Sequence, residues 1–412
     1  MNSARVVRTI FLLPFLFLVL AALDGAQAYT FSVLYTFQGV GKDGAEPTGH
    51  LVLDNAGNLY GTTVNGGRRR CTRNIIYGCG TAYKLAPDGR ETVLRAFDQT
   101  DGRFPEWGLV QSKAGSFYGT TAYGGAGDWG TVFMMAPDGT ETVLHSFSGK
   151  DGGYPIGLAQ DSAGNLYGVG SGGNPNCSGG AGCGLVFKVA PDGTDTTLYE
   201  FQGGSDGAFP SSPLIKDKAG NFYGTTAYGG GGTACGGQPP LGCGTVFKLT
   251  PDGAETILYA FSGGSDGGLP AARVAMDSAG NLYGTTYGGG AFQYGVIFKL
   301  TPAGVETVLY SFAGGSDGWS PGAVGFLNGS GNLYGTTNWG GGTGCGGFGC
   351  GTVFSLAPDG TETILHSFTG GTDGGVPDGA LTADKAGNLY GTAEIGGAGC
   401  TQGCGTVFKL TP

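Results

Sequence analysis

The sequence is poor in charge, and above all in clustered positive charge. Only 13% of its 412 residues are charged, and the formal net charge is −10. A nucleic-acid partner requires a basic face, because the phosphates dominate the affinity. The chain offers no Lys/Arg cluster beyond the triplet at 68–70, which we expect to be a solvated loop tip. We therefore expect no nucleic-acid partner.

Long hydrophobic runs are also missing, except at the N-terminus. An apolar run over 9–23 follows two arginines and precedes the small-residue site Ala26-Gln27-Ala28. This order is typical of a secretory signal peptide, and the run is short for a spanning helix. We predict a signal peptide over 1–28 and one domain over 29–412. The mature chain is expected to be secreted to the extracellular space or the periplasm, as a monomer without a membrane span.

Glycine, in contrast, is abundant. The chain has 89 glycines but no collagen-like period, and 11% of its residues are aromatic. The glycines stand at turns between short apolar runs, a pattern that favours an all-β chain with many tight corners.

One unit recurs along the chain. The motif G-N-L-Y-G-T-T and its variants return at intervals of roughly 55 residues, near the period of propeller blades. Its tyrosines are Tyr60, Tyr118, Tyr167, Tyr223, Tyr283, Tyr334 and Tyr390.

Each unit carries four strand signals, which we name a to d in chain order. Strand b is of the type Leu59–Thr63, strand c of the type 244–249, and strand d of the type 255–261. Tight turns of the types D-x-A-G-N and P-D-G join a to b and c to d. Aromatic residues recur at fixed positions in strands b, c and d and are expected to fill the wedges between blades.

The strands close a ring. Strand c occurs seven times, but only six d strands follow a c strand. The seventh d pattern lies at 31–37, directly after the predicted signal peptide. A ring in which this strand completes the last blade removes exposed sheet edges. We predict an all-β fold: a seven-bladed β-propeller with four antiparallel strands per blade, closed by the N-terminal strand.

The units G-N-L-Y-G-T-T, G-T-V-F-K-L and P-D-G-T-E-T-V-L-Y-S-F resemble the GloVer tandem repeat of exported bacterial proteins. The resemblance covers about 30–412. It implies a propeller-like repeat fold but no catalytic residues, because the family has no established activity. Its members carry varied C-terminal anchors, which we do not expect in this chain. The motif D-x-x-G-N-L-Y is more loosely similar to NHL-type and lyase propellers.

Ten cysteines form five local pairs, each between strands b and c. We predict the disulfides Cys71–Cys79, Cys177–Cys183, Cys235–Cys243, Cys345–Cys350 and Cys400–Cys404. The pairs occur only where the b–c loop is long, and Trp129 and Tyr294 take the place of the second cysteine in the two short loops. A crosslink across such a loop stabilises by about 2–3 kcal/mol. Metal binding by the cysteines is the rival reading, although no loop offers a histidine ligand.

The b–c and d–a loops emerge on one face, are long and differ between units, so any binding site is expected there. The d–a loop has the motif D-G-x-x-P in every unit. Its carboxylates either cap a turn before glycine or form a weak candidate set for calcium: Asp43, Asp101, Asp151, Asp206, Asp266, Asp317 and Asp373. No other cofactor is expected.

Aromatic residues gather on the same face. The candidate ligand-binding residues are Trp107, Trp129, Trp319, Trp339, Tyr123, Tyr228 and Tyr287, with the three tyrosines at positions equivalent to Trp339. They either stack against a sugar or peptide or roof the blades beneath the loops.

Catalytic motifs are missing, and no catalytic residue is assigned. Of the three histidines, His145 and His366 stand where other units have Tyr or Arg, and His50 is not repeated. We interpret the chain as a non-enzymatic binding or structural module that recognises a glycan or an extended peptide. The alternative is a polysaccharide lyase or hydrolase at the central channel mouth. A unique cluster of acid, base and aromatic groups there would favour the enzyme.

Overall fold

The structure is a computed structural model that describes residues 29–39, 41–67, 71, 77–173, 177, 182–232, 235, 242–270, 272–398, 400 and 403–412. The signal peptide predicted over 1–28 and the arginine triplet at 68–70 lie outside the described residues. No helix in the described part of the chain is long and apolar enough to cross a membrane.

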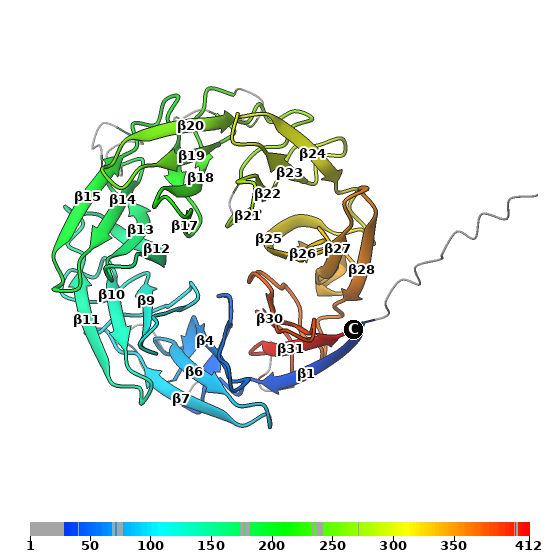
Figure 1. Cartoon of the computed structure of the whole chain (residues 1–412). Helices are drawn as coiled ribbons and strands as arrows, with labels where there is room; N and C mark the ends of the chain where they lie inside the picture. Colours follow the sequence, from blue (N-terminus) through cyan, green and yellow to red (C-terminus); the bar gives the residue numbers. More distant parts are fainter. Residues whose placement is uncertain are drawn as a thin grey trace, which may run out of the picture.

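Seven antiparallel sheets surround a central axis, as the repeat count predicts (Figure 1). Blade 1 contains β3 (Val52–Leu53), β4 (Leu59–Thr63), β6 (Thr81–Leu85) and β7 (Glu91–Ala96). Blade 2 contains β8 (Val110–Gln111), β9 (Phe117–Thr121), β10 (Thr131–Met135) and β11 (Glu141–Ser146). Blade 3 contains β12 (Gly153–Gln160), β13 (Leu166–Ser171), β14 (Leu185–Val189) and β15 (Asp195–Glu200).

The remaining blades repeat this order. Blade 4 contains β16 (Ala208–Pro210), β17 (Ile215–Lys216), β18 (Phe222–Tyr228), β19 (Thr245–Leu249) and β20 (Glu255–Ala260). Blade 5 contains β21 (Ala275–Met276), β22 (Leu282–Thr286), β23 (Val296–Leu300) and β24 (Glu306–Ser311). Blade 6 contains β25 (Trp319–Leu327), β26 (Leu333–Trp339), β27 (Thr352–Leu356) and β28 (Glu362–Ser367). A short pair, β2 (Gly44–Ala45) with β5 (Asn65–Gly66), lies in the loops of blade 1.

The two ends of the described chain share blade 7. It contains β29 (Thr382–Ala383), β30 (Leu389–Ala393), β31 (Thr406–Thr411) and, as its outer strand, β1 (Thr30–Thr36). Figure 1 shows β1 beside β31. Phe31 of β1 pairs with Leu410 of β31, and Thr36 pairs with Thr406. The predicted ring closure by the N-terminal strand is confirmed.

The D-x-x-G-N-L-Y motif closes the turn between strands a and b. The Asp54 carboxylate accepts hydrogen bonds from the backbone N–H of Ala56 and Asn58, the Asn58 amide and the Tyr60 hydroxyl. Burial raises the pKa of Asp54, but these hydrogen bonds outweigh it and hold the pKa below its usual value. The tyrosine of strand b is therefore tied to the turn that precedes it.

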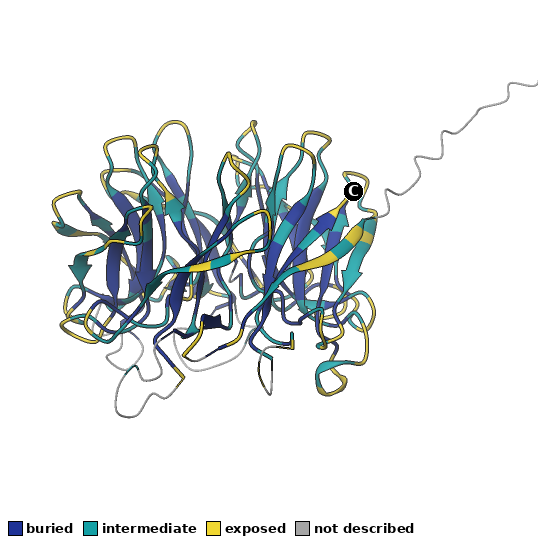
Figure 2. Ribbon diagram, turned by 90° about the horizontal axis from the view of Figure 1, so that it is seen from below, coloured by how far each residue is buried: buried dark blue, intermediate teal, exposed yellow. Residues whose placement is uncertain are grey.

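The core lies between blades. In Figure 2, buried residues occupy the middle of the strands, and exposed residues line both rims. At every junction an aromatic residue that follows strand d packs on the strand c aromatic of the next blade, with ring centroids 5.0 to 5.4 Å apart. The seven pairs are Phe37–Tyr83, Phe97–Phe133, Phe147–Phe187, Phe201–Phe247, Phe261–Phe298, Phe312–Phe354 and Phe368–Phe408. All fourteen rings are at least 98% buried.

All five predicted disulfides are present, with Cα atoms 4.9 to 5.7 Å apart. In blade 6 the bridge Cys345–Cys350 lies so close to Gly370 of the following d–a loop that a side chain there would collide with sulfur. Trp129 occupies the same place over Gly149, and Tyr294 over Gly314. The aromatic residues of the two short loops thus replace the disulfide in packing.

The d–a loop is locked to the preceding blade by the residue before its proline. That residue has a left-handed backbone in all seven loops, with φ from +47° to +59°, although none is glycine: Glu46, Phe104, Tyr154, Phe209, Leu269, Ser320 and Val376. Its N–H donates to the carbonyl of the residue two positions before strand c in the previous blade, over 2.7 to 3.2 Å. This repeated hydrogen bond fixes where each chain segment enters the central channel.

The outer strands form a continuous belt (Figure 1). The first residue of strand d lies near the D-G-x-x-P aspartate of the d–a loop that leads into the same blade. In blade 4, Glu255 lies near Asp206 in this way. Burial and the neighbouring aspartate raise the pKa of this glutamate to about 7 at five junctions: Glu91, Glu141, Glu255, Glu306 and Glu362. One carboxyl oxygen of each is buried without a hydrogen-bond partner.

These glutamates predict that stability falls as the pH rises. Their folded pKa of about 7 lies above the unfolded value, so the folded state binds more protons between about pH 5 and 8. We expect the melting temperature to decrease across this window in thermal unfolding scans. Glu255→Gln, which keeps a neutral side chain beside Asp206 and Tyr199, should reduce the decrease and raise stability at pH 8. Glu200→Gln, at an exposed position, is the control; a flat profile for the wild type would contradict the interpretation.

Candidate functional site

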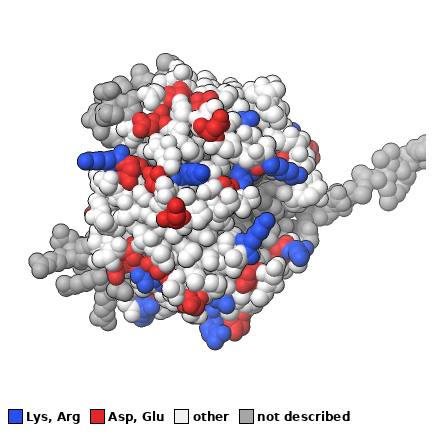
Figure 3. Space-filling view, turned by 60° about the vertical axis from the view of Figure 1, so that its left-hand side comes forward, with Lys and Arg blue, Asp and Glu red and all other residues white. Residues whose placement is uncertain are grey.

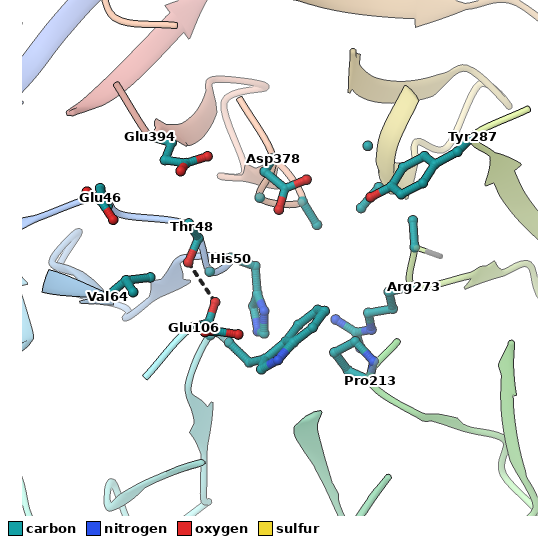
Figure 4. A pocket seen from close by; sticks show the side chains of 18 residues that line it. Glu46, Thr48, His50, Val64, Glu106, Pro213, Arg273, Tyr287, Asp378 and Glu394 are labelled. Atoms are coloured by element: carbon teal, nitrogen blue, oxygen red, sulfur yellow. Dashed lines mark hydrogen bonds between the residues drawn. The ribbon is translucent and has the colours of Figure 1, made fainter. Parts of the chain in front are cut away.

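The mouth pocket lies where the chain enters strand a of blades 1, 2, 4, 5, 6 and 7, and it has a volume of about 280 Å³. We use this name for the cavity lined by Glu46, Thr48, His50, Val64, Glu106, Trp107, Pro213, Arg273, Tyr287, Asp378, Glu394 and neighbouring small residues (Figure 4). The Thr48 hydroxyl donates to the carbonyl of Glu106 over 2.7 Å, joining blades 1 and 2 at the rim.

The charged side chains of the mouth pocket break the repeat. The position after the loop proline is Glu106 in blade 2 and Asp378 in blade 7, but Thr48 in blade 1. Two residues further on stand His50 in blade 1 and Arg273 in blade 5, where blade 2 has glycine. The position after strand b is Glu394 in blade 7 and valine in blade 1. The same repeat position in different blades therefore places chemically different side chains in one cavity.

Arg273 is an unpaired cation in this cavity. Its Nε is buried and has no hydrogen-bond partner, and no carboxylate within the described residues forms an ion pair with its guanidinium. Burial lowers the pKa of Arg273. Arg273 also lines a second cavity of about 870 Å³, bordered mainly by blades 5 and 6. The side chain as a whole is partly exposed, but its Nε is buried without a partner, so it is suited to an anionic ligand group.

Four carboxyl groups line the other part of the mouth pocket: Glu46, Glu106, Asp378 and Glu394 (Figure 4). Burial, and then the charges of Asp378, Glu46 and Glu106, together raise the pKa of Glu394 to about 7. Burial also raises the pKa of Asp378, against a hydrogen bond of 3.1 Å from Asn338 that lowers it. Glu394 can therefore hold or release a proton near neutral pH.

His50 and Tyr287 are uncharged partners of this site. Burial, and then the nearby Arg273, lower the pKa of His50 to about 4 against a hydrogen bond with the backbone of Leu109 that raises it. Burial, followed by the charge of Asp378, raises the pKa of Tyr287. At neutral pH, Arg273 is thus the one cation among the residues that line the mouth pocket.

Two of the seven predicted aromatic residues, Trp107 and Tyr287, line the mouth pocket. The sequence analysis predicts that Tyr287 is equivalent to Trp339, and this prediction is wrong. Thr286 and Thr337 of strand b each pair with the first residue of strand c. Tyr287 is one residue beyond this paired position, whereas Trp339 is two residues beyond it. Because side chains alternate along a strand, this offset turns Tyr287 toward the channel.

The other five aromatic residues lie in three groups outside the mouth pocket. Trp319 stacks on Trp339 with centroids 5.9 Å apart, flanked by Tyr294 and by Phe348, which is 64% exposed. Trp129 and Tyr123 both pack edge-on against Tyr154. Tyr228 packs on Phe209. The seven candidates therefore do not form one surface.

The seven D-G-x-x-P aspartates each close a d–a loop. Every one accepts a backbone hydrogen bond from the loop, as Asp206 does from Gln202 over 2.7 Å. Each is also bonded by the strand d residue that varies as Tyr, Arg or His: Tyr35, Arg95, His145, Tyr199, Tyr259, Tyr310 and His366. These contacts fit the turn-capping interpretation, and the calcium hypothesis remains a prediction.

The sequence interpretation missed Glu46, Glu106, Arg273, Asp378 and Glu394. A signal was available, because charged residues stand at axis-facing repeat positions in only some units. Reading it requires the register of strand a, which the short strands β3, β8 and β21 do not reveal by pattern alone. Figure 3 shows basic and acidic side chains mixed on the molecular side, without a continuous basic face in that view.

The fold and the mouth pocket define a closed seven-bladed β-propeller with a non-repetitive site at one end of its channel. The Gloeobacter/Verrucomicrobia repeat matches residues 20–179, 71–237 and 231–412. The chain belongs to this repeat family, as the resemblance of its motifs indicates. No curated protein sequence matches it.

Solved structures share the fold at low identity. A virginiamycin B lyase from Staphylococcus aureus, crystallised as an inactive variant with quinupristin, has a TM-score of 0.59 at 13% identity, covering 93% of this chain and 100% of the lyase. An extracellular domain of a one-component system from B. thetaiotaomicron has a TM-score of 0.53 at 12% identity, covering 93% of this chain and 42% of that one. At such identities the likeness concerns the fold alone.

Because Arg273 has no ion-pair partner, we expect that removing its charge stabilises the protein. Arg273→Leu should raise the free energy of unfolding by about 1–3 kcal/mol, because an unsatisfied buried polar group is replaced by an apolar one. Arg95→Leu should lower it, because Arg95 is paired with Asp101. Urea unfolding of both variants checks this, and a loss of stability in Arg273→Leu would show that Arg273 has a structural partner.

Proposed function

We propose that the chain is an exported binding protein whose mouth pocket holds an acidic carbohydrate. The ligand carboxylate lies on Arg273, its hydroxyl groups on the acidic residues, and its ring against Trp107. Export rests on the signal peptide predicted over 1–28. The five disulfides are consistent with an extracellular or periplasmic location, where thiols oxidise.

The observation that carries the proposal is the unpaired Arg273. A guanidinium forms two parallel hydrogen bonds to a carboxylate, and this pairing is strong where water is largely excluded. Arg95 and Arg103, in contrast, each have a carboxylate partner, Asp101 and Asp128 respectively. Arg273 has none, so a bound anion would supply the missing group.

The rest of the mouth pocket suits a sugar. Carboxylates accept hydrogen bonds from hydroxyl groups, and Glu46, Glu106, Asp378 and Glu394 offer such acceptors around one cavity. Trp107 supplies the flat apolar surface that packs against the C–H face of a sugar ring. A volume of about 280 Å³ lies at the small end of ligand pockets, which favours one sugar unit rather than a peptide strand.

The experiment is isothermal titration calorimetry with a galacturonic acid oligosaccharide and a neutral galactose oligosaccharide of equal length. The wild type should prefer the acidic ligand. Arg273→Gln should weaken acidic-ligand binding about 10- to 100-fold, because it removes a charged hydrogen bond. Trp107→Ala should weaken both ligands.

Trp319→Ala is the matched control, because Trp319 belongs to an aromatic group outside the mouth pocket. It should leave both affinities unchanged. Loss of binding in Trp319→Ala but not in Trp107→Ala would move the site to the outer aromatic surface. Equal affinity for acidic and neutral ligands would contradict the role of Arg273.

Cleavage of such a polysaccharide is a second candidate, favoured by one observation. Glu394 has a pKa of about 7 and lies beside other carboxyl groups. Such a pair can act as the acid that protonates a glycosidic oxygen and the base that activates water. Wild-type chain incubated with polygalacturonate should then release reducing ends, and Glu394→Gln should abolish the release. If the wild type releases no reducing ends between about pH 4 and 8, cleavage is contradicted and binding is the function that stands.

A further inference from the structure

The junctions between blades repeat one arrangement of three side chains. A residue near the end of strand d bonds the D-G-x-x-P aspartate, and the first residue of the next strand d approaches the same aspartate. Four junctions combine tyrosine with glutamate, as Tyr199, Asp206 and Glu255 do. The junction between blades 1 and 2 combines Arg95, Asp101 and Glu141. Two junctions contain histidine and depart from this rule.

The junction between blades 2 and 3 is the one where all three members are metal-ligand types. His145 of β11 lies with Nε2 3.0 Å from Oδ2 of Asp151, and Asp195 is the first residue of β15. One ligand atom from each of the three lies within 4.8 Å of the others. We propose that His145, Asp151 and Asp195 bind a divalent transition-metal ion of the zinc type.

The charge at this junction requires compensation. Asp151 and Asp195 place two carboxyl groups against a single imidazole, and Oδ1 of Asp195 is buried without a hydrogen-bond partner. A cation would neutralise the pair and use the free oxygen.

The donor set selects the class of metal. Imidazole with two carboxylates, leaving positions for water, suits zinc and similar ions, whereas calcium prefers oxygen ligands alone. His145 and Asp151 retain 16% and 30% of their side-chain exposure, which leaves a path for the ion. The bound ion would connect β11, the following loop and β15. Blade 2 lacks a disulfide in its b–c loop, so this ion would supply a crosslink where the chain has none.

The chain supplies its own negative control at the junction between blades 6 and 7. His366 lies 3.2 Å from Asp373. The third position is taken by Phe31, the second residue of β1, which pairs with Leu410 as Glu255 pairs with Leu249. Phe31 stacks on the imidazole with centroids 3.7 Å apart. Phe31 provides no ligand atom. This junction should therefore bind no metal.

The test is zinc titration of the metal-free full chain by calorimetry, with thermal unfolding in parallel. The wild type should bind one zinc ion per chain and melt at a higher temperature with zinc. His145→Tyr and Asp195→Glu restore residues found at other junctions, so both should fold and melt like the wild type in chelator. Each should bind zinc more than about tenfold more weakly, because one of three ligands is lost or displaced.

His366→Tyr should leave zinc binding unchanged. The proposal is overturned if the wild type binds no zinc, if calcium binds in preference to zinc, or if His145→Tyr keeps wild-type affinity. It is likewise overturned if His366→Tyr, rather than His145→Tyr, abolishes binding.

Discussion

The structure depends on one contact repeated seven times: the aromatic residue that follows strand d packs on the strand c aromatic of the next blade. Each pair adds about 0.5–1.5 kcal/mol beyond the burial of its area. A repeat array that ends freely would leave one such pair unmade. Here the pair Phe37–Tyr83 is made by the residue that follows β1, so the N-terminal strand supplies both the last strand of blade 7 and the packing against blade 1.

Closure of the ring creates the site. Seven d–a loops, each held by a left-handed residue and a hydrogen bond to the preceding blade, deliver their chain to one channel mouth. The equivalent positions of other blades carry uncharged residues, such as Ile156 and Leu158 in blade 3. Where the chain instead places His50, Glu106, Arg273, Asp378 and Glu394, unlike groups from blades 1, 2, 5 and 7 meet in one cavity. The unpaired Arg273 then costs stability, which a binding function would explain.

The fold could be predicted from the sequence because its determinants are local and repeated. Tyr60 and its turn aspartate are six residues apart, each cysteine pair spans at most eight, and the excess d strand at the N-terminus indicates closure. The site could not be predicted in the same way. His50 and Glu394 are far apart in the chain, and their meeting follows from closure together with the register of short strands. Tyr287 shows the consequence: an error of one residue in its predicted position is enough to assign its side chain to the wrong group of aromatic residues.

The mouth pocket depends on closure of the ring by β1. Thermal unfolding of a chain in which residues 29–38 are deleted, compared with the full chain at equal pH, tests this closure. We expect a much lower melting temperature or the loss of cooperative unfolding, because the deletion removes the outer strand of blade 7 and the ring of Phe37 from the junction with blade 1. An unchanged melting temperature would contradict closure by β1, and with it the convergence of the loops on the mouth pocket.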